Sequence, residues 1–388
     1  MKRNSLLIGA LVAAVAFTLL ARNGAISGGG RGGAVAAPPG GPGQAGQPGQ
    51  PAGGVDPDSF FTPTKLEPGQ RPPQFVVVSF DGVGSHEKWQ FWRGVAEQAN
   101  MRFTGFLSGV YLVGAEHRTA YQGPGHRPGQ SAIGFPSAAG VRQEILDLNE
   151  GWRSGYEIGT HYNGHFCAGS GYPGSAWTTA DWTSELQQFF TFYRQYKQVN
   201  DDPDLPTLEV PADTIKGGRT PCLEGRRAQL MPALRRFGFA YDSSGNRNGI
   251  AWPRKNGYGI WEFPMAYVPM AGTGSGVISM DYNFWVKQTG NPPNTGDSVA
   301  DSGQIVATYQ QMFDAAYNGS RPPLVLGNHF NSWNNNAYTN ALATFVKSAC
   351  HQPDTYCVPY RDVIRWMQAQ DPQVLANLQR LPAVDTVA

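Results

Sequence analysis

Short apolar segments alternate with amphipathic segments along most of the chain after residue 74. Residues 75–80 (FVVVSF) form a nearly continuous apolar run, which is typical of a strand buried on both faces. Residues 87–100 (EKWQFWRGVAEQAN) instead place apolar side chains at helical spacing. The same alternation predicts further strands at 102–113, 156–161, 215–221, 239–244, 259–265, 322–330 and 356–360, and further helices at 138–151, 179–197, 228–238, 301–319, 335–350 and 361–370.

Repeated strand-then-helix units predict an α/β fold with a mostly parallel sheet and right-handed crossovers. About seven units over roughly 300 residues favour a closed barrel over an open sheet. The long amphipathic helix at 179–197 is expected to begin at a cap formed by Thr179 or Asp181. Residues 115–140 show no regular pattern, and we expect this insert to form a loop over or beside a substrate groove.

The chain begins with a segment that predicts export. Residues 1–23 combine a basic start with an uncharged apolar stretch. This stretch is long for the core of a signal peptide and slightly short for a membrane span, and the nearest Ala-x-Ala site lies downstream at 34–36. A cleaved signal peptide and a retained signal anchor both remain open. Either one places the rest of the chain outside the cytoplasm, secreted or anchored at the cell envelope.

Residues 24–73 are rich in Gly, Pro, Gln and Ala and contain few large apolar side chains. Such a segment cannot bury enough surface to offset the entropy lost on ordering. We therefore predict a flexible linker at 24–73 and a folded domain at 74–388, which we expect to be a monomer.

The overall charge is nearly balanced, with 30 basic and 29 acidic residues and no long run of either sign. We therefore expect no nucleic-acid partner. The chain has 10 Trp residues and 12% aromatic residues, a content that fits the aromatic-lined surface of a carbohydrate binder. Most Trp side chains nevertheless fill protein cores, so we assign the larger share of them to the core.

Four cysteines in an exported chain favour disulfides. Cys350 and Cys357 lie close in sequence around a short loop, whereas Cys167 and Cys222 each follow a candidate functional motif. We predict the pairs Cys350–Cys357 and Cys167–Cys222. Four free buried thiols are the alternative, and a cysteine zinc site is disfavoured because the chain has no CxxC motif.

Polar residues with catalytic potential come at the ends of the predicted strands. Asp81 ends the first strand, His161 and His165 follow the third, Arg219 ends the fourth, and His329 ends a late one. Each alone has an ordinary structural explanation, such as a capping Asp, a surface His or an ion-paired Arg. Because the carboxyl ends of barrel strands share one face, we expect these five side chains to converge.

These residues lie in a set of motifs that resembles the polysaccharide deacetylases of carbohydrate esterase family 4, the NodB-homology fold. The resemblance extends from about residue 75 to residue 371 and is closest to the chitin-deacetylase-like branch. It implies a distorted (β/α)7 barrel. The matching segments are SFDGVG (79–84), HYNGH (161–165), GGRTPCLEG (217–225) and LVLGNHF (324–330).

The resemblance also implies a chemistry, the metal-assisted hydrolysis of an acetyl group. His161 and His165 would be Zn²⁺ ligands, or ligands of another divalent metal, and Zn²⁺ would activate a water molecule. Asp81 matches the catalytic base, and His329 matches the general acid that protonates the leaving group. Arg219 would hold Asp81 ionised and oriented through a charge-assisted ion pair.

The resemblance further places a backbone N–H that binds the oxyanion near Cys222. A cysteine stands here where the family usually has an aromatic residue. The family's fourth motif, Asp-x-x-Asp-Trp, is missing after Asp242, and the segment with Asp281 and Trp285 (DYNFW) is a possible substitute. Trp285 and Trp333 are expected to contact the substrate.

One departure concerns the metal itself. Family members usually have a second aspartate as the third metal ligand, where this chain has Gly82, which offers no donor atom. Asp81 could ligate the metal itself, or another group could complete the site. A third alternative is weak metal binding in an inactive relative. The other candidate ligands are His86, Glu87 and Asn163.

Three functions follow in order of preference. The first is an extracytoplasmic metal-dependent deacetylase acting on an acetylated polysaccharide, either peptidoglycan or a chitin-like N-acetylglucosamine polymer, with acetylated xylan as a further option. The second is a catalytically weak or inactive glycan-binding protein of the cell envelope. The third, a glycosidase, would need two carboxylates facing a sugar, and the sequence plainly offers only Asp81.

Overall fold

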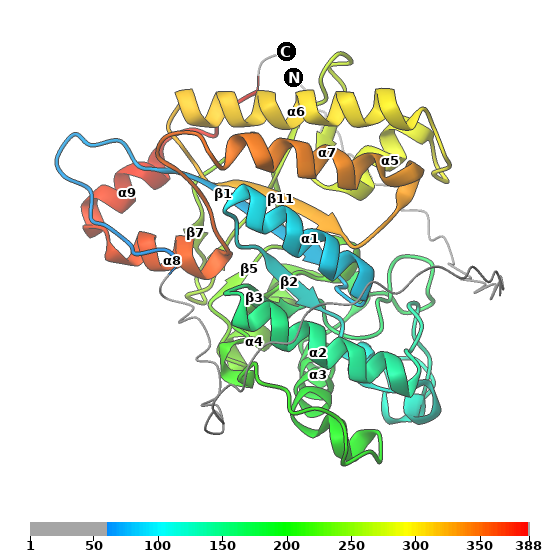
Figure 1. Cartoon of the computed structure of the whole chain (residues 1–388). Helices are drawn as coiled ribbons and strands as arrows, with labels where there is room; N and C mark the ends of the chain where they lie inside the picture. The colour runs from blue at the N-terminus through cyan, green and yellow to red at the C-terminus, as the bar shows by residue number, and fades with distance from the viewer. Residues whose placement is uncertain (1–59, 387–388) are drawn as a thin grey trace, which may run out of the picture.

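The computed structural model describes residues 60–386 (Figure 1). The predicted signal peptide or anchor at 1–23 lies outside these residues, as does the linker from 24 to 59. The strands are β1 (Gln74–Asp81), β2 (Thr104–Leu107), β3 (Glu157–Thr160), β4 (Gly217–Gly218), β5 (Tyr241–Asp242), β6 (Asn246–Asn248), β7 (Arg254–Lys255), β8 (Trp261–Glu262), β9 (Met265–Pro269), β10 (Gly276–Ile278), β11 (Leu324–His329) and β12 (Thr355–Cys357).

The main sheet follows the order β11-β1-β2-β3-β4-β5-β8-β7, and β12 pairs with β1 beside this path. Every neighbouring pair from β11 to β8 is parallel, and only β7 pairs with β8 in the antiparallel sense. Seven parallel strands therefore form the curled wall of a distorted (β/α) barrel, as predicted.

A second, three-stranded sheet lies where the wall would otherwise have to close. Its order is β10-β9-β6. The N–H of Met265 in β9 donates to Gly245, just after β5, and Gly327 of β11 donates to Ser279, just after β10. The second of these bonds links the second sheet to β11, one end of the curled wall, and the first lies beside the end of β5. The short strands of this sheet were not predicted from the sequence.

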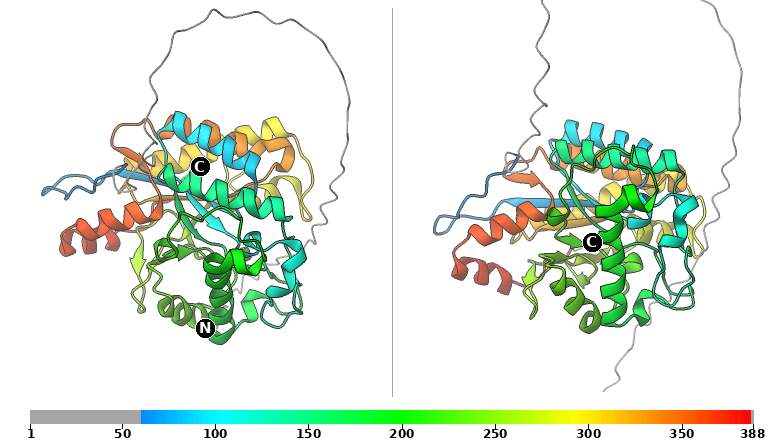
Figure 2. Two further views of the ribbon diagram at one scale, coloured as in Figure 1. Left: turned by 60° about the horizontal axis from the view of Figure 1, so that its bottom comes forward. Right: turned by 90° about the horizontal axis from the view of Figure 1, so that it is seen from below.

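The helices cover the outer face of the wall (Figures 1 and 2). The pair α6 and α7 lies side by side over β11 and β1, and α1 and α2 continue the layer over β2 and β3. The helices are α1 (His86–Ala99), α2 (Ala138–Arg153), α3 (Thr179–Val199), α4 (Arg227–Arg236), α5 (Asp281–Thr289), α6 (Ser298–Asn318), α7 (Trp333–Ala349), α8 (Tyr360–Ala369) and α9 (Pro372–Arg380).

Strand β1 shows how the sequence determines the inside of the barrel. Val76, Val78 and Phe80 pack into the cluster that also contains the helix residues of the outer layer. Phe75 and Val77 instead pack into the cluster that contains Tyr241 and Tyr360. Because side chains alternate along a strand, the residues at 79 and 81 share the inner face with these two, which directs the last carboxylate of β1 toward the barrel interior.

The structure corrects three details of the sequence prediction. The cap of α3 is Thr178, rather than Thr179 or Asp181, and Asp181 completes a capping box with it. The segment after α8 contains one further helix, α9, and α5 was also missed. Phe61, assigned to the linker by composition, is buried and packs edge-on against Phe75.

Both predicted disulfides are present. Cys167 bonds to Cys222 across 55 residues, and Cys350 bonds to Cys357 across 7 residues. None of the cysteines between residues 60 and 386 is free. In the same part of the chain, no helix combines the length and the apolar character that crossing a bilayer requires.

The two disulfides should differ in their contribution to stability. In the chain-entropy model, closing the longer loop stabilises the fold by about 4 kcal/mol and closing the shorter one by about 2.5 kcal/mol. Cys167→Ser/Cys222→Ser should therefore lower the denaturant midpoint more than Cys350→Ser/Cys357→Ser, measured by urea unfolding under non-reducing conditions. A larger loss in the Cys350/Cys357 variant would contradict this order.

Candidate active site

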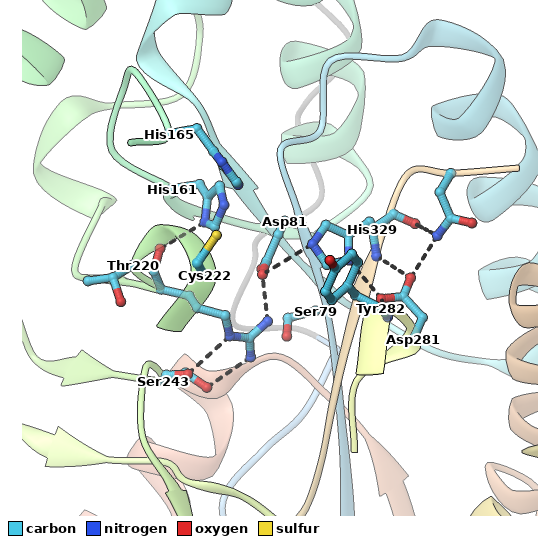
Figure 3. A network of polar contacts seen from close by, with 12 residues as sticks. Ser79, Asp81, His161, His165, Thr220, Cys222, Ser243, Asp281, Tyr282 and His329 are labelled. Carbon is cyan, nitrogen blue, oxygen red and sulfur yellow. Dashed lines mark hydrogen bonds and ion pairs between the residues drawn. The ribbon is translucent and has the colours of Figure 1, made fainter. Parts of the chain in front are cut away.

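Four strands end at polar side chains that meet on one face of the barrel (Figure 3). Asp81 is the last residue of β1 and pairs in register with His329, the last residue of β11. His161 follows β3, and Arg219 follows β4. In Figure 3, Asp81 lies between the pair His161 and His165 on one side and His329 on the other. The convergence expected from the strand ends is therefore observed.

A buried ion pair forms the centre of this face. Nη1 of Arg219 donates to Oδ1 of Asp81 at 2.8 Å, and both residues are at most 4% exposed. Three further guanidinium hydrogens donate to Ser243, through its backbone oxygen and its hydroxyl, and to the Tyr360 hydroxyl. A buried pair is tolerated only when such partners compensate the lost hydration. These partners leave Arg219 a single orientation.

His161 has the protonation state that a metal ligand requires. Its Nδ1 lies 2.8 Å from the backbone oxygen of Arg219. Since a carbonyl only accepts, Nδ1 must carry the proton, and the lone pair is on Nε2. Burial, followed by the effect of the nearby His329, lowers the pKa of His161 to about 3. The ring is therefore neutral, with a free donor atom on the side away from Arg219.

His165 lies beside it, with 5.2 Å between the two ring centroids. Burial, followed by the effect of His161, lowers the pKa of His165 to about 3. Its backbone is in the left-handed region, with φ at +56°, as is that of Tyr162 at +58°. Two adjacent neutral imidazoles on a constrained loop suit a divalent metal such as Zn²⁺.

The residues proposed as a third ligand differ in their surroundings. The side chain of His86 is 44% exposed, and its Nδ1 lies 2.7 Å from Oδ1 of Asp147, on the helical layer. Glu87 is exposed on the same helix. Asn163 is buried, and its amide nitrogen donates to the backbone oxygen of Glu185. Asp81 is therefore the best-placed oxygen donor of the set.

Gly82 has room for a side chain. Its φ is +62°, and a Cβ placed on it would meet only the Ser108 and Tyr111 hydroxyls, each at 3.7 Å, and one ring carbon of Tyr111. Asp and Asn tolerate this left-handed conformation better than other residues. The position that lacks the third ligand is thus sterically able to accept one.

The Cys167–Cys222 disulfide joins the histidine loop to the loop after Arg219. The sulfurs of Cys167 and Cys222 and a ring nitrogen of His165 lie within 4.8 Å of one another. Sulfurs bonded to each other are not thiolates, so this group is not a metal site in the oxidised protein. Cys222 itself has a φ of +54°. The disulfide fixes the backbone there, where the sequence places the oxyanion donor.

His329 has a carboxylate partner of its own. Its Nδ1 lies 2.7 Å from Oδ1 of Asp281, whose Oδ2 accepts from the His329 backbone N–H and from Asn331. Burial lowers the pKa of His329, but the Asp281 carboxylate outweighs this effect and raises the pKa above its usual value. Nε2 of His329 is 4.0 Å from Oδ2 of Asp81. Asp281 thus contacts both the backbone and the imidazole of His329.

The two tryptophans predicted to bind substrate stack on each other beside His329. Their ring centroids are 4.6 Å apart, and that of Trp333 is 5.1 Å from the His329 ring. Trp285 is buried and donates to the backbone of Asn294, whereas Trp333 is half-buried. Tyr282, which the sequence did not single out, packs edge-on against Trp333 and completes the cluster.

The sequence also missed the residues that hold Arg219. Ser243 follows β5, in the segment YDSS, and Tyr360 begins α8, in the segment VPYRD. Both are buried in the barrel interior, where Tyr360 also contacts Ser79 of β1. Their position along the sequence could have identified them. A polar residue at the end of a predicted barrel strand lies at the same end of the barrel as Asp81.

Comparison with known proteins supports the fold. No protein-family model matches the sequence, and no curated protein does. A structure from Mycobacterium smegmatis, named as a polysaccharide deacetylase, has a TM-score of 0.50 at 15% identity and covers 84% of this chain and 98% of its own.

Two further structures have lower scores. A family 4 carbohydrate esterase from Streptomyces lividans has a TM-score of 0.38 at 12% identity, covering 73% of this chain and 91% of its own. A pseudoenzyme of the same family from Bacillus anthracis has a TM-score of 0.35 at 10% identity, covering 81% and 70%. The Mycobacterium structure therefore carries the assignment, and the chain has the fold of a polysaccharide deacetylase.

Proposed function

We propose that this protein is an extracytoplasmic, zinc-dependent deacetylase that removes acetyl groups from an N-acetylglucosamine polymer such as peptidoglycan or chitin. The observation that carries the proposal is that two reactive groups are paired with partners of opposite charge. The carboxylate of Asp81 is held by the cation Arg219, and the imidazole of His329 is held by the anion Asp281. Environments that differ in this way separate a base from an acid.

The donor set fits zinc. His161 and His165 are neutral, adjacent and on one loop, and Asp81 supplies the nearest carboxylate. Zinc held there would lower the pKa of a water ligand and polarise the acetyl carbonyl. This chain lacks the usual second aspartate at Gly82, so Asp81 would have to serve both as a ligand and as a base. We expect weak activity for this reason.

The residues around the metal ligands have separate roles in the proposal. Asp81 takes the proton of the attacking water through Oδ2, because Oδ1 is bonded to Arg219 and Oδ2 lies on the side of His329, 4.0 Å from its Nε2. His329, protonated at Nε2, donates that proton to the leaving nitrogen. The backbone at Cys222 would donate to the oxyanion, and the disulfide holds it in place.

The substrate class follows from the aromatic cluster and from the compartment. Trp333 presents a half-buried aromatic surface next to the acid, which suits the apolar face of a sugar ring. The two disulfides and the apolar start of the sequence support an extracytoplasmic location. The name of the Mycobacterium structure agrees with a polysaccharide substrate. The alternative is an inactive glycan-binding relative, and Gly82 is the observation that favours it.

The metal assignment predicts the effect of removing both histidines. His161→Ala/His165→Ala should abolish zinc binding, because it removes both imidazole donors. The fold should survive, because both residues lie on a loop at the strand end. Zinc content per chain and the thermal midpoint would be measured together. His86→Ala is the matched control and should keep full zinc content. Unchanged zinc in the double variant would refute the assignment.

The same site predicts a gain of function at Gly82. Gly82→Asp should tighten zinc binding at least 10-fold and raise acetate release from an N-acetylglucosamine oligomer, because a direct ligand should matter at least as much as an outer-shell partner, whose loss typically costs 10–100-fold. Gly82→Asn keeps the left-handed backbone and adds no charge, so it is the matched control and should gain much less.

Each outcome distinguishes the two functions. Acetate release that is measurable in the parent and rises in Gly82→Asp supports the deacetylase, whereas release that appears only in Gly82→Asp supports the inactive relative. A fall from a measurable parent rate would mean that another residue already completes the metal site. No acetate from either form, with zinc affinity unchanged, would exclude the deacetylase and leave the glycan-binding alternative.

A further inference from the structure

A buried glutamate outside the reacting groups contacts the backbone of the histidine loop. Glu185 of α3 is fully buried. Its Oε1 accepts from the backbone N–H groups of Asn163 at 3.0 Å and of Gly164 at 3.3 Å, both of which lie between the two histidines. Its backbone oxygen accepts from the Asn163 side chain at 2.8 Å. One helical residue therefore binds the loop at three points.

The insert at 115–140 reaches the same carboxylate and the backbone oxygen of Gly164. The hydroxyl of Tyr121 donates to both oxygens of Glu185, at 3.1 and 3.0 Å. The N–H of Ala132 donates to the backbone oxygen of Gly164 at 2.8 Å, and the hydroxyl of Ser131 donates to it at 3.3 Å. The insert thus packs behind the histidine loop and bonds to it.

The loop is in a conformation that needs such support. Tyr162 and His165 have φ values of +58° and +56°, which non-glycine residues rarely adopt without compensating contacts. Gly164 has no space for a side chain, because a Cβ there would lie 2.3 Å from the Tyr121 hydroxyl oxygen. The turn between the histidines is therefore constrained by Glu185 and by the insert together.

We propose that Glu185 is a positioning residue for the metal ligands and that the insert at 115–140, through Tyr121, Ser131 and Ala132, clamps the His161–His165 loop against α3. The positioning role rests on one part of the proposed function, which is that the His161–His165 loop binds zinc. It assigns the insert to ligand geometry in place of the substrate-groove role expected from the sequence. Glu185 would fix the direction in which the two imidazoles point without touching the metal.

Glutamine and alanine variants separate this role from a general contribution to folding. Glu185→Gln keeps an oxygen that accepts from both loop N–H groups, so it should bind zinc within about 3-fold of the parent. Glu185→Ala leaves those N–H groups buried without a partner, so it should weaken zinc binding by roughly 10–100-fold, the range typical of outer-shell partners. Zinc affinity would be measured by competition with a chromophoric chelator.

Gln188 provides the matched control, since it lies one turn further along α3. Its side chain exchanges hydrogen bonds with the backbone of Gln122 in the insert and, within residues 60–386, makes none to the histidine loop. Gln188→Ala should therefore bind zinc as the parent does. If Glu185→Ala binds zinc as tightly as Gln188→Ala, the positioning role is refuted.

Amide hydrogen exchange of the 161–166 segment, measured on the metal-free full chain, provides a readout that does not depend on zinc. Exchange at Asn163 and Gly164 should be at least 10-fold faster in Glu185→Ala than in the parent. If the parent binds no zinc but this acceleration is seen, the proposed function fails and the clamp stands. If the parent binds zinc and exchange is unchanged in the variant, the clamp fails and the proposed function stands.

Tyr121→Phe keeps the test decisive if Glu185→Ala does not fold. It removes a single hydroxyl and leaves the ring packed against Phe166 and Phe192. Zinc binding should weaken by about 3-fold, and exchange at Gly164 should rise by a similar factor. Identical zinc affinity and identical exchange in Tyr121→Phe and the parent would overturn the role of the insert.

Discussion

The buried ion pair between Asp81 and Arg219 is the constraint on which the rest of the site depends. A guanidinium placed inside a barrel loses its hydration, and breaking such a pair by removing one partner typically costs about 3–5 kcal/mol. The barrel therefore provides acceptors for three other guanidinium hydrogens, at Ser243 and at Tyr360. The backbone oxygen of Arg219 also fixes the tautomer of His161. One residue thus orients the Asp81 carboxylate through its side chain and the His161 ring through its backbone.

A second pairing on the opposite side of Asp81 gives the site its asymmetry. Asp281 begins α5 and accepts from the backbone N–H of His329 while it bonds to the imidazole. This contact raises the pKa of His329, whereas burial lowers the pKa of His161 and of His165 to about 3. Three histidines on one face therefore divide into two whose pKa is lowered and one whose pKa is raised.

Much of this arrangement could be predicted because it depends on local rules. The apolar run of β1 and the helical spacing of α1 set the first unit of the barrel, and the place of Asp81 at the end of that strand predicted the face on which it lies. Arg219 and His329 followed from their positions at strand ends. Both disulfides were also correctly predicted, because an exported chain with four cysteines leaves few pairings.

Other features depend on tertiary contacts that no local pattern encodes. The second sheet consists of β6, β9 and β10. Of these, β6 and β10 are only three residues long, which is too short for a periodic signal. The role of Asp281 required knowing that α5 begins beside β11. Glu185 looks like an ordinary polar position on an amphipathic helix, and only its contacts with Gly164 and Tyr121 distinguish it.

In the proposed function, Asp81 acts as the base and His329 as the acid because Arg219 and Asp281 hold them in different states. The pH profile of acetate release from an N-acetylglucosamine oligomer, compared between the parent and Asp281→Asn, tests it most directly. Asp281 raises the pKa of His329. Its neutral replacement should lower that pKa, so the loss of kcat/KM on the alkaline side should begin at a lower pH in the variant. An alkaline limb at the same pH in both proteins would contradict the account.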